Sequence, residues 1–154
     1  MTEREIIDLI LKHEGAIYHQ DKFTNYFTKF GISARTHAHL DLRNLTGEQA
    51  LAIHKKDFYD FFKIKDLNPR LRGIVYQAGI MLGFSESFRL LSQAVDYFPL
   101  KESLTPELLS AVELSNPEAA RARMASLLVF WFSDHFGGNN LRAIIPRIME
   151  SVSN

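Results

Sequence analysis

Cysteine is absent from the chain. Without it the protein has no disulfide scaffold, no thiolate nucleophile and no cysteine-ligated metal site. An excess of charge of one sign is lacking as well, because 18 lysine and arginine residues balance 18 aspartate and glutamate residues. Proteins that bind nucleic acids or anionic membrane surfaces usually carry a broad positive footprint, which a neutral chain does not provide. We therefore expect no nucleic-acid partner.

Long apolar runs are also missing from the sequence. No run approaches the roughly 20 residues that a membrane-spanning helix needs. Residues 1–5 lack the basic region and the apolar stretch that open a secretory signal. The sequence therefore predicts no membrane span, and a protein made in the cytoplasm that would need another route to act outside it.

What the chain does contain is typical of a globular domain. Of its 154 residues, 46% are hydrophobic and 12% aromatic. A chain of this length buries roughly 68 to 70% of its unfolded surface in one core. Internal repeats and low-complexity linkers are not evident in the sequence. We predict one domain spanning residues 1–154.

Helix-start signals recur along the sequence. Thr2 with Glu5, and Thr46 with Gln49, have the spacing of capping boxes. Gly15 supplies the residue type at which helices commonly end. Further starts come from a capping side chain followed by proline, which is favoured at the first helical position. These signals predict a mostly α fold of six to seven helices, at about residues 2–14, 46–62, 69–82, 85–95, 105–115, 117–136 and from Asn139 or Asn140 onward.

Two further expectations concern the last two predicted helices. Phe130, Trp131 and Phe132 lie in the longest helix, and we expect them to be buried in the core. Pro146 should kink or shorten the last helix, because proline removes a helical hydrogen bond. No segment shows the regular alternation typical of a β-strand.

Helical periodicity lapses between residues 16 and 44, a segment rich in aromatic side chains. Loops of this length are uncommon in compact domains and are often functional. We predict a long ordered active-site loop after the first helix, with room for a short hairpin.

Glu14 is the strongest candidate for chemistry. Gly15 places it in the last turn of the first helix, where the negative end of the helix dipole disfavours a carboxylate. Apolar neighbours such as Ile10 and Ile17 would act in the same direction, and a protonated carboxyl is what a general acid requires. The alternative is an exposed helix-end glutamate that pairs with Lys12 or His13.

Two blocks of sequence around Glu14 resemble a known family. Residues 11–17 are similar to the pattern Leu-x-x-Glu-Gly-Gly-Tyr, and residues 23–33 to Asp-Pro-Gly-Gly-x-Thr-x-x-Gly-Ile-Thr. These patterns belong to glycoside hydrolase family 108, lysozyme-like enzymes of bacteria and their phages that are also described as secretion-activating proteins. Residues 41–50, 75–83 and 136–142 resemble later parts of the family. The matching positions in the two blocks are Glu14, Gly15, Thr28, Gly31 and Ile32.

The resemblance implies a fold and a reaction. It implies a lysozyme-like helical fold, in which residues 1–96 resemble the catalytic muramidase part and residues 97–154 the peptidoglycan-associated C-terminal helices. The implied reaction is cleavage of the β-1,4 bond between N-acetylmuramic acid and N-acetylglucosamine, with Glu14 as catalytic acid and no cofactor. A bacterial or phage protein that reaches the cell wall after release is then expected.

Glycoside cleavage also needs a group that stabilises an oxocarbenium-like transition state. Asp21 is the preferred second carboxylate, with a turn-forming aspartate about equally plausible, and Asp41 is the poorer candidate. Thr28, at a matching family position, would orient a water or bond a sugar hydroxyl. Its alternative is a loop hydroxyl bonded to the backbone.

Four residues are predicted to bind substrate: Tyr18, Asn25, Tyr26 and Gln77. Tyrosine suits carbohydrate because it offers an aromatic face and a polar tip, whereas the alternative for both tyrosines is packing of the loop. Gln77 would bond a sugar amide, or else be an ordinary surface glutamine. No metal site is predicted, because the three loop histidines do not have zinc-site spacing.

The chain also departs from the family pattern. Ala16 and Ile17 replace Gly-Tyr, Asn25 and Tyr26 replace Gly-Gly, and Gln77 and Met81 replace Asp and Asn. These differences motivate a rival hypothesis to a muramidase, a non-catalytic peptidoglycan-binding relative. The Phe-rich helices motivate a second rival, a helical protein-interaction module.

Overall fold

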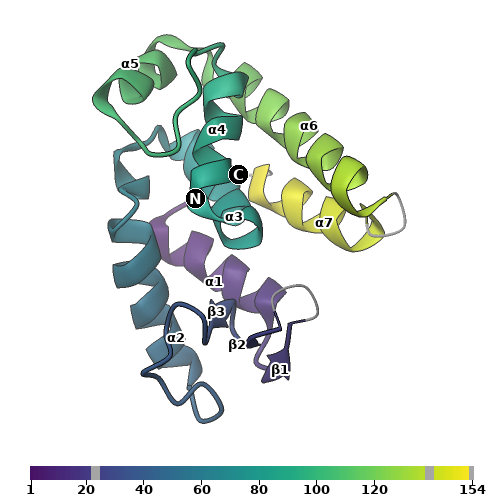
Figure 1. The fold of residues 1–154 in the computed structure, drawn as a ribbon. Helices are drawn as coiled ribbons and strands as arrows, with labels where there is room; N and C mark the ends of the chain where they lie inside the picture. Colours follow the sequence, from purple (N-terminus) through teal and green to yellow (C-terminus); the bar gives the residue numbers. More distant parts are fainter. Residues whose placement is uncertain (22–24, 138–140, 153–154) are drawn as a thin grey trace.

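A computed structural model describes residues 1–21, 25–137 and 141–152. Over these residues the chain is mostly helical, as predicted (Figure 1). The π-helical segment η1 (His54–Asp60) continues α2, and the 3-10 turn η2 (Ile64–Asp66) precedes α3. The α-helices are α1 (Glu3–Glu14), α2 (Gly47–Ile53), α3 (Pro69–Leu82), α4 (Phe84–Ala94), α5 (Pro106–Leu114), α6 (Pro117–Phe136) and α7 (Leu141–Val152).

The predicted caps explain where the helices begin. In α1 the Glu5 amide donates to the Thr2 hydroxyl, and the Thr2 amide donates to the Glu5 carboxylate at 2.7 Å. The same reciprocal pair forms between Thr46 and Gln49 at the start of α2. Each pair satisfies two backbone N–H groups at the start of the helix, which have no partners within the helix.

The core is centred on α3, which packs against α1, α4, α6 and α7. Most of its residues are buried, including Leu71, Ile74, Val75 and Ala78. A helix that is apolar around most of its circumference has to lie inside the domain. The other helices therefore pack around α3, and α1 and α7 both contact it.

A small antiparallel sheet occupies the segment after α1. Its strands are β1 (His19–Gln20), β2 (Phe27–Lys29) and β3 (Ile32–Ser33), in the order β1-β2-β3. Thr28 is paired with His19 on one side and with Ser33 on the other. The short hairpin that the sequence left room for is therefore present. Strands of two or three residues are too short to show a period of two, so the sequence did not indicate which residues form them.

Three expectations need correction or completion. Phe130 is not in the core: it is 71% exposed, whereas Phe132 is buried, because adjacent residues on a surface helix lie about 100° apart. The helix predicted to about residue 62 changes at His54 from α to π geometry. Helix α7 continues through Pro146. Its predicted start at Asn139 or Asn140 lies outside the described residues.

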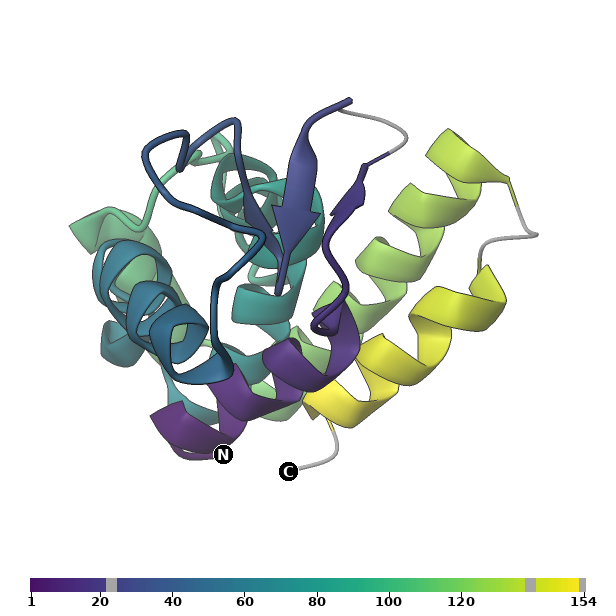
Figure 2. The same ribbon diagram turned by 90° about the horizontal axis from the view of Figure 1, so that it is seen from below.

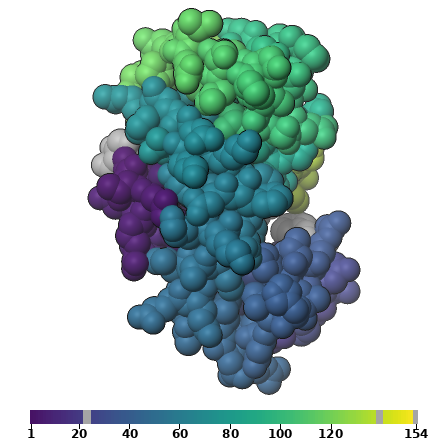
Figure 3. Space-filling model, turned by 90° about the vertical axis from the view of Figure 1, so that its left-hand side faces the viewer, coloured from purple at the N-terminus to yellow at the C-terminus, as the bar shows by residue number. Residues whose placement is uncertain are grey.

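Seen from below, α1 lies between α2 and α7, with the strands beside its C-terminal end (Figure 2). In the space-filling view, the blue segment after α1 and the green α5 occupy opposite ends of the molecule (Figure 3). Within the described residues, none of the helices is both long enough and apolar enough to span a membrane.

Candidate active site

Glu14 is the last residue of α1, and Gly15 ends the helix with φ 71°. The Glu14 side chain is only 22% exposed. The turn between β2 and β3 lies against it: a Cβ atom built on Gly31 would be 2.8 Å from Cγ of Glu14 and 3.4 Å from Cγ2 of Ile80 on α3. Glu14 is therefore held between the end of α1, the hairpin turn and α3.

A buried hydrogen-bond network fixes this turn. The Phe30 amide donates to the Gly15 carbonyl at 3.1 Å. His54 is fully buried, with Nε2 at 2.7 Å from the Phe30 carbonyl oxygen and Nδ1 at 2.8 Å from the Tyr76 hydroxyl. Burial lowers the pKa of His54, which favours a neutral ring that donates from Nε2 to the Phe30 carbonyl. The Tyr76 hydroxyl also donates to the His54 backbone carbonyl at 3.1 Å. Burial likewise raises the pKa of Tyr76, so its hydroxyl stays protonated.

An arginine contacts Glu14 directly. The Arg147 guanidinium on α7 forms an ion pair with Glu14 Oε1, and the Arg147 side chain is 21% exposed. Sequence reasoning missed this residue because it lies 133 positions away, in a helix without a recognisable site motif. Lys12 and His13, the partners considered from the sequence, instead lie 3.1 and 3.3 Å from a Glu150 carboxylate oxygen.

His13 also responds to this arrangement. Its pKa is lowered, first by burial and then by the positive charge of Arg147, while Glu150 acts in the opposite direction. The last turn of α1 therefore meets a cation and an anion that both come from α7.

The two other predicted catalytic residues belong to the three-stranded sheet and its connections, called the hairpin below. Thr28 is in β2, and its hydroxyl donates to the Ile32 carbonyl at 3.1 Å. The Asp21 amide donates to the Tyr26 carbonyl and its carbonyl accepts from the Asn25 amide, each at 2.9 Å. Thr28 is thus near the turn that contacts Glu14, and Asp21 follows β1.

The predicted substrate-binding residues of the hairpin are accessible. Tyr18 stacks on Phe27 with ring centroids 4.8 Å apart and planes only 2° from parallel. The Arg43 guanidinium lies 5.4 Å from the Tyr18 ring centroid. Tyr26 and Asn25 are exposed, and Gln20 donates to the side-chain oxygen of Asn25 at 2.9 Å. The aromatic platform therefore pairs Tyr18 with Phe27, a residue that is not among the four predicted to bind substrate.

Gln77 differs from the other predicted binding residues. It is 0% exposed, and neither amide atom has a hydrogen-bond partner among the described residues. Buried polar groups are normally satisfied. A sugar amide could reach Gln77 only if the helices around α3 moved.

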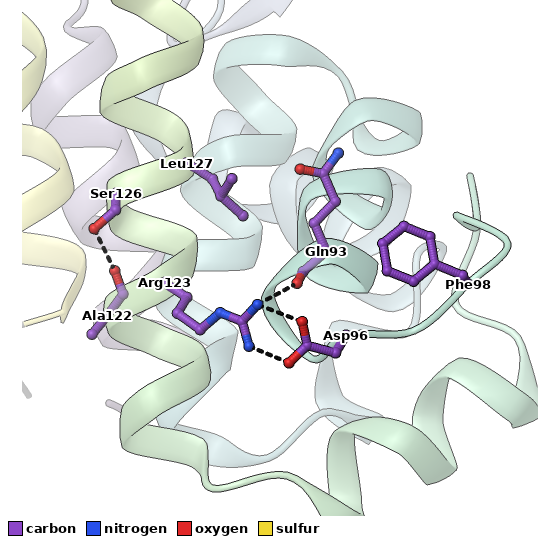
Figure 4. A pocket seen from close by; sticks show the side chains of 7 residues that line it. All are labelled: Gln93, Asp96, Phe98, Ala122, Arg123, Ser126 and Leu127. Carbon is purple, nitrogen blue, oxygen red and sulfur yellow. Dashed lines mark hydrogen bonds and ion pairs between the residues drawn. The ribbon is translucent and has the colours of Figure 1, made fainter.

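Two hollows occur elsewhere on the surface. One, of about 550 Å³, lies where α6 meets the end of α4, and Arg123 there forms a bidentate ion pair with Asp96 and a 3.2 Å hydrogen bond to the Gln93 carbonyl (Figure 4). The other lies between α6 and α7 and has mainly apolar walls that include Val129 and Ile145. Glu14 lines neither. Over the described residues, no three His, Asp or Glu side chains gather as a metal site would require.

Comparison with known proteins identifies the family. A family model described as glycosyl hydrolase 108 matches residues 7–83, half of the chain. The chain belongs to the glycosyl hydrolase 108 family. The matched region contains Glu14, all three strands and the whole of α3. A glycoside hydrolase domain, with a glycan as the substrate class, is what this family membership supports.

The fold agrees with this glycosyl hydrolase 108 membership. The solved structure of SagA from Brucella abortus is 15% identical, with a TM-score of 0.80 over 97% of this chain and 92% of that one. At this identity the likeness speaks for the fold, which is the lysozyme-like helical fold expected from the resemblance. No functionally curated protein matches the chain.

Proposed function

We propose that the protein is a peptidoglycan hydrolase that cleaves the β-1,4 bond between N-acetylmuramic acid and N-acetylglucosamine. Glu14 acts as the general acid in this proposal. The observation that carries it is the placement of Glu14, a partly buried carboxyl at a helix end, enclosed by the hairpin turn at Gly31 and by α3. The family membership of residues 7–83 supports the same assignment.

The chemistry requires two functions from the site. A protonated carboxyl donates its proton to the leaving glycosidic oxygen, and a second group stabilises the oxocarbenium-like transition state or activates a water. We assign the second function to Asp21, which follows β1 in the same sheet whose β2–β3 turn contacts Glu14. The Thr28 hydroxyl donates to the Ile32 carbonyl, so its oxygen can still accept a hydrogen bond from the attacking water.

The platform of Tyr18 and Phe27 provides a surface for the sugar rings. Stacked aromatic faces suit the apolar faces of sugars, and the polar tip of tyrosine suits their hydroxyl groups. Arg43 beside Tyr18 adds a positive charge that would attract the carboxyl groups of peptidoglycan. These residues favour an acidic glycan over a neutral one.

The decisive experiment measures reducing sugar released from purified sacculi by the native protein and by Glu14→Gln. The substitution keeps the side-chain shape and removes the transferable proton, so release should fall by at least about 100-fold, the lower range for loss of general acid catalysis. Glu113→Gln, on the exposed side of α5, is the matched control. Mass spectrometry of the fragment ends identifies the bond that is cut. Equal release by Glu14→Gln and the native protein would remove Glu14 from the mechanism.

The Arg147 ion pair and the buried Gln77 favour a second candidate, a peptidoglycan-binding relative without hydrolytic activity. In that case the carboxylate of Glu14 serves only to hold α7. Co-sedimentation of the protein with sacculi, without any reducing sugar above background, would support this candidate against the hydrolase.

A further inference from the structure

Helix α7 covers the last turn of α1 through charged contacts. Arg147 pairs with Glu14, and one oxygen of Glu150 lies 3.1 Å from Lys12 Nζ and 3.3 Å from His13 Nε2. These contacts join residues from opposite ends of the sequence. The side chain proposed as the catalytic acid therefore depends on the position of the C-terminal helix.

The pair between Arg147 and Glu14 has a chemical consequence. A guanidinium keeps its charge at physiological pH, offers only hydrogen-bond donors and cannot serve as a proton source. A carboxylate beside it is favoured in the ionised form. A general acid, however, must carry a proton when the substrate bond breaks. The ion pair and the acid role of Glu14 therefore exclude each other.

Gln77, on α3, provides an independent observation on how α7 is packed. A Cβ atom on Gly73 would be 2.8 Å from the Ser151 carbonyl oxygen, so this face of α3 lies against α7. Gln77 follows Gly73 by four residues and Arg147 precedes Ser151 by four, which is about one helical turn in each case.

Ile80, near the end of α3, lies beside Gly31, which contacts Glu14, and Glu14 in turn contacts Arg147. Gln77 lies about one helical turn along α3 from Gly73, which packs on α7, and its buried amide lacks hydrogen-bond partners among the described residues.

We propose that Arg147 is a positioning residue whose guanidinium holds the Glu14 carboxylate in an ion pair in the free protein, and that the bound glycan displaces this guanidinium before the reaction. This inference rests on the proposed function. After displacement, Glu14 takes a proton from solvent and donates it to the glycosidic oxygen as the C–O bond breaks. A water then adds its hydroxyl to the sugar carbon and gives its proton to the carboxylate. Glu14 releases that proton to solvent when its ion pair with Arg147 re-forms, so the protein is unchanged after one cycle.

Other charged groups around Glu14 also affect a pH profile. His13 of α1 and His54 of η1 both interact electrostatically with Glu14, and Glu150 of α7 faces His13. The hairpin presents Gly31, which has no side chain. Burial lowers the pKa of both histidines, so they are neutral at the alkaline pH where the effect of Arg147 is sought.

The test compares pH profiles of peptidoglycan hydrolysis for the native protein, Arg147→Met and Arg147→Lys. Removing the guanidinium should shift the alkaline limb of the activity profile to higher pH by about one unit. This is the lower end of the effect of an adjacent opposite charge. Activity on that limb would then rise about tenfold. Arg147→Lys should lie between the two. Lys12→Met, which removes a neighbouring contact of α7 without touching Glu14, should leave the limb in place.

A second measurement does not depend on hydrolysis. The side-chain carboxyl signal of Glu14 is followed by carbon-13 NMR against pH in the native protein and both variants. The signal should titrate at higher pH in Arg147→Met than in the native protein. Unchanged titration, or loss of activity in Arg147→Met with an unmoved limb, overturns the proposal. Absence of hydrolysis in every protein, together with a shifted titration, refutes the proposed function and leaves the role of Arg147 supported.

Discussion

Gly31 lies so close to Glu14 that a Cβ atom at residue 31 would be 2.8 Å from Cγ of Glu14. Gly31 also has φ 73°, a conformation that side chains rarely adopt. Both conditions require glycine at the hairpin turn. The β2–β3 turn therefore packs against the Glu14 side chain and restricts its position.

Gly31→Ala should displace Glu14 and reduce hydrolysis by at least about tenfold, because small misplacements of a catalytic group are costly. Gly15→Ala is a matched control: Gly15 has φ 71°, yet nothing lies within 4 Å of its Cβ position. Both variants should lose about 1 to 2 kcal/mol in free energy of unfolding from the backbone conformation. Equal activities in the two variants, measured on sacculi, would show that contact with Glu14 does not matter.

The platform of Tyr18 and Phe27 leads to a prediction about substrate affinity. Tyr18→Ala removes one ring of the stack and the aromatic partner of Arg43. Binding to sacculi should weaken by about 2- to 12-fold, since an aromatic contact contributes about 0.5 to 1.5 kcal/mol beyond its buried area. Phe130→Ala removes a more exposed ring on α6, away from the sheet, and should bind normally. A binding isotherm that is unchanged in Tyr18→Ala would exclude the platform.

The helical part of this architecture was predictable because its signals are local. Thr2 with Glu5 and Thr46 with Gln49 form the capping boxes that their spacing indicates. Glu14 was placed at a helix end because Gly15 follows it. Such signals involve residues within about one turn of each other, so the sequence displays them directly.

The contacts that define the site are not local. Arg147 meets Glu14 only because α7 packs on α1, and neither residue has a neighbour in sequence that indicates the pair. The burial of Gln77 likewise depends on how α3 is covered. The residues of the strands could not be predicted from the sequence, because a strand of two residues is defined by its pairing and not by an alternating pattern. The roles of Glu14 and the other predicted site residues stay predictions.

Asp21 is the proposed catalytic carboxylate, whereas Asp41 is a turn-forming one, and substitutions distinguish the two roles. Asp41 accepts hydrogen bonds from the side chain and backbone of Asn44, and these bonds lower the pKa of Asp41. Asp21→Asn should reduce turnover of sacculi by at least about 100-fold. Asp41→Asn should keep its turnover and lose up to about 1 kcal/mol in free energy of unfolding. Normal turnover in Asp21→Asn would require another second group.

His54 predicts how stability depends on pH. Burial lowers its pKa in the folded protein from an ordinary value of 6.5. Below about pH 6.5 the unfolded chain therefore binds a proton that the folded protein excludes. The contribution of His54 to stability is complete above that pH and is lost as the pH falls toward the folded pKa. His13, whose pKa is also lowered, acts in the same direction.

The free energy of unfolding should accordingly fall between pH 7.5 and 5.5, a range above the titration of ordinary carboxyl groups. His54→Gln should be less stable than the native protein at pH 7.5, by about 1 to 3 kcal/mol, because the Phe30 carbonyl and Tyr76 hydroxyl lose a well-placed partner. Its stability should nevertheless change less between the two pH values, since the contribution of His54 to the pH dependence is gone while that of His13 remains. His39→Gln alters an exposed ring and should parallel the native protein. Urea unfolding at both pH values measures all three, and a slope in His54→Gln as steep as the native one would contradict a neutral buried imidazole beneath the hairpin turn.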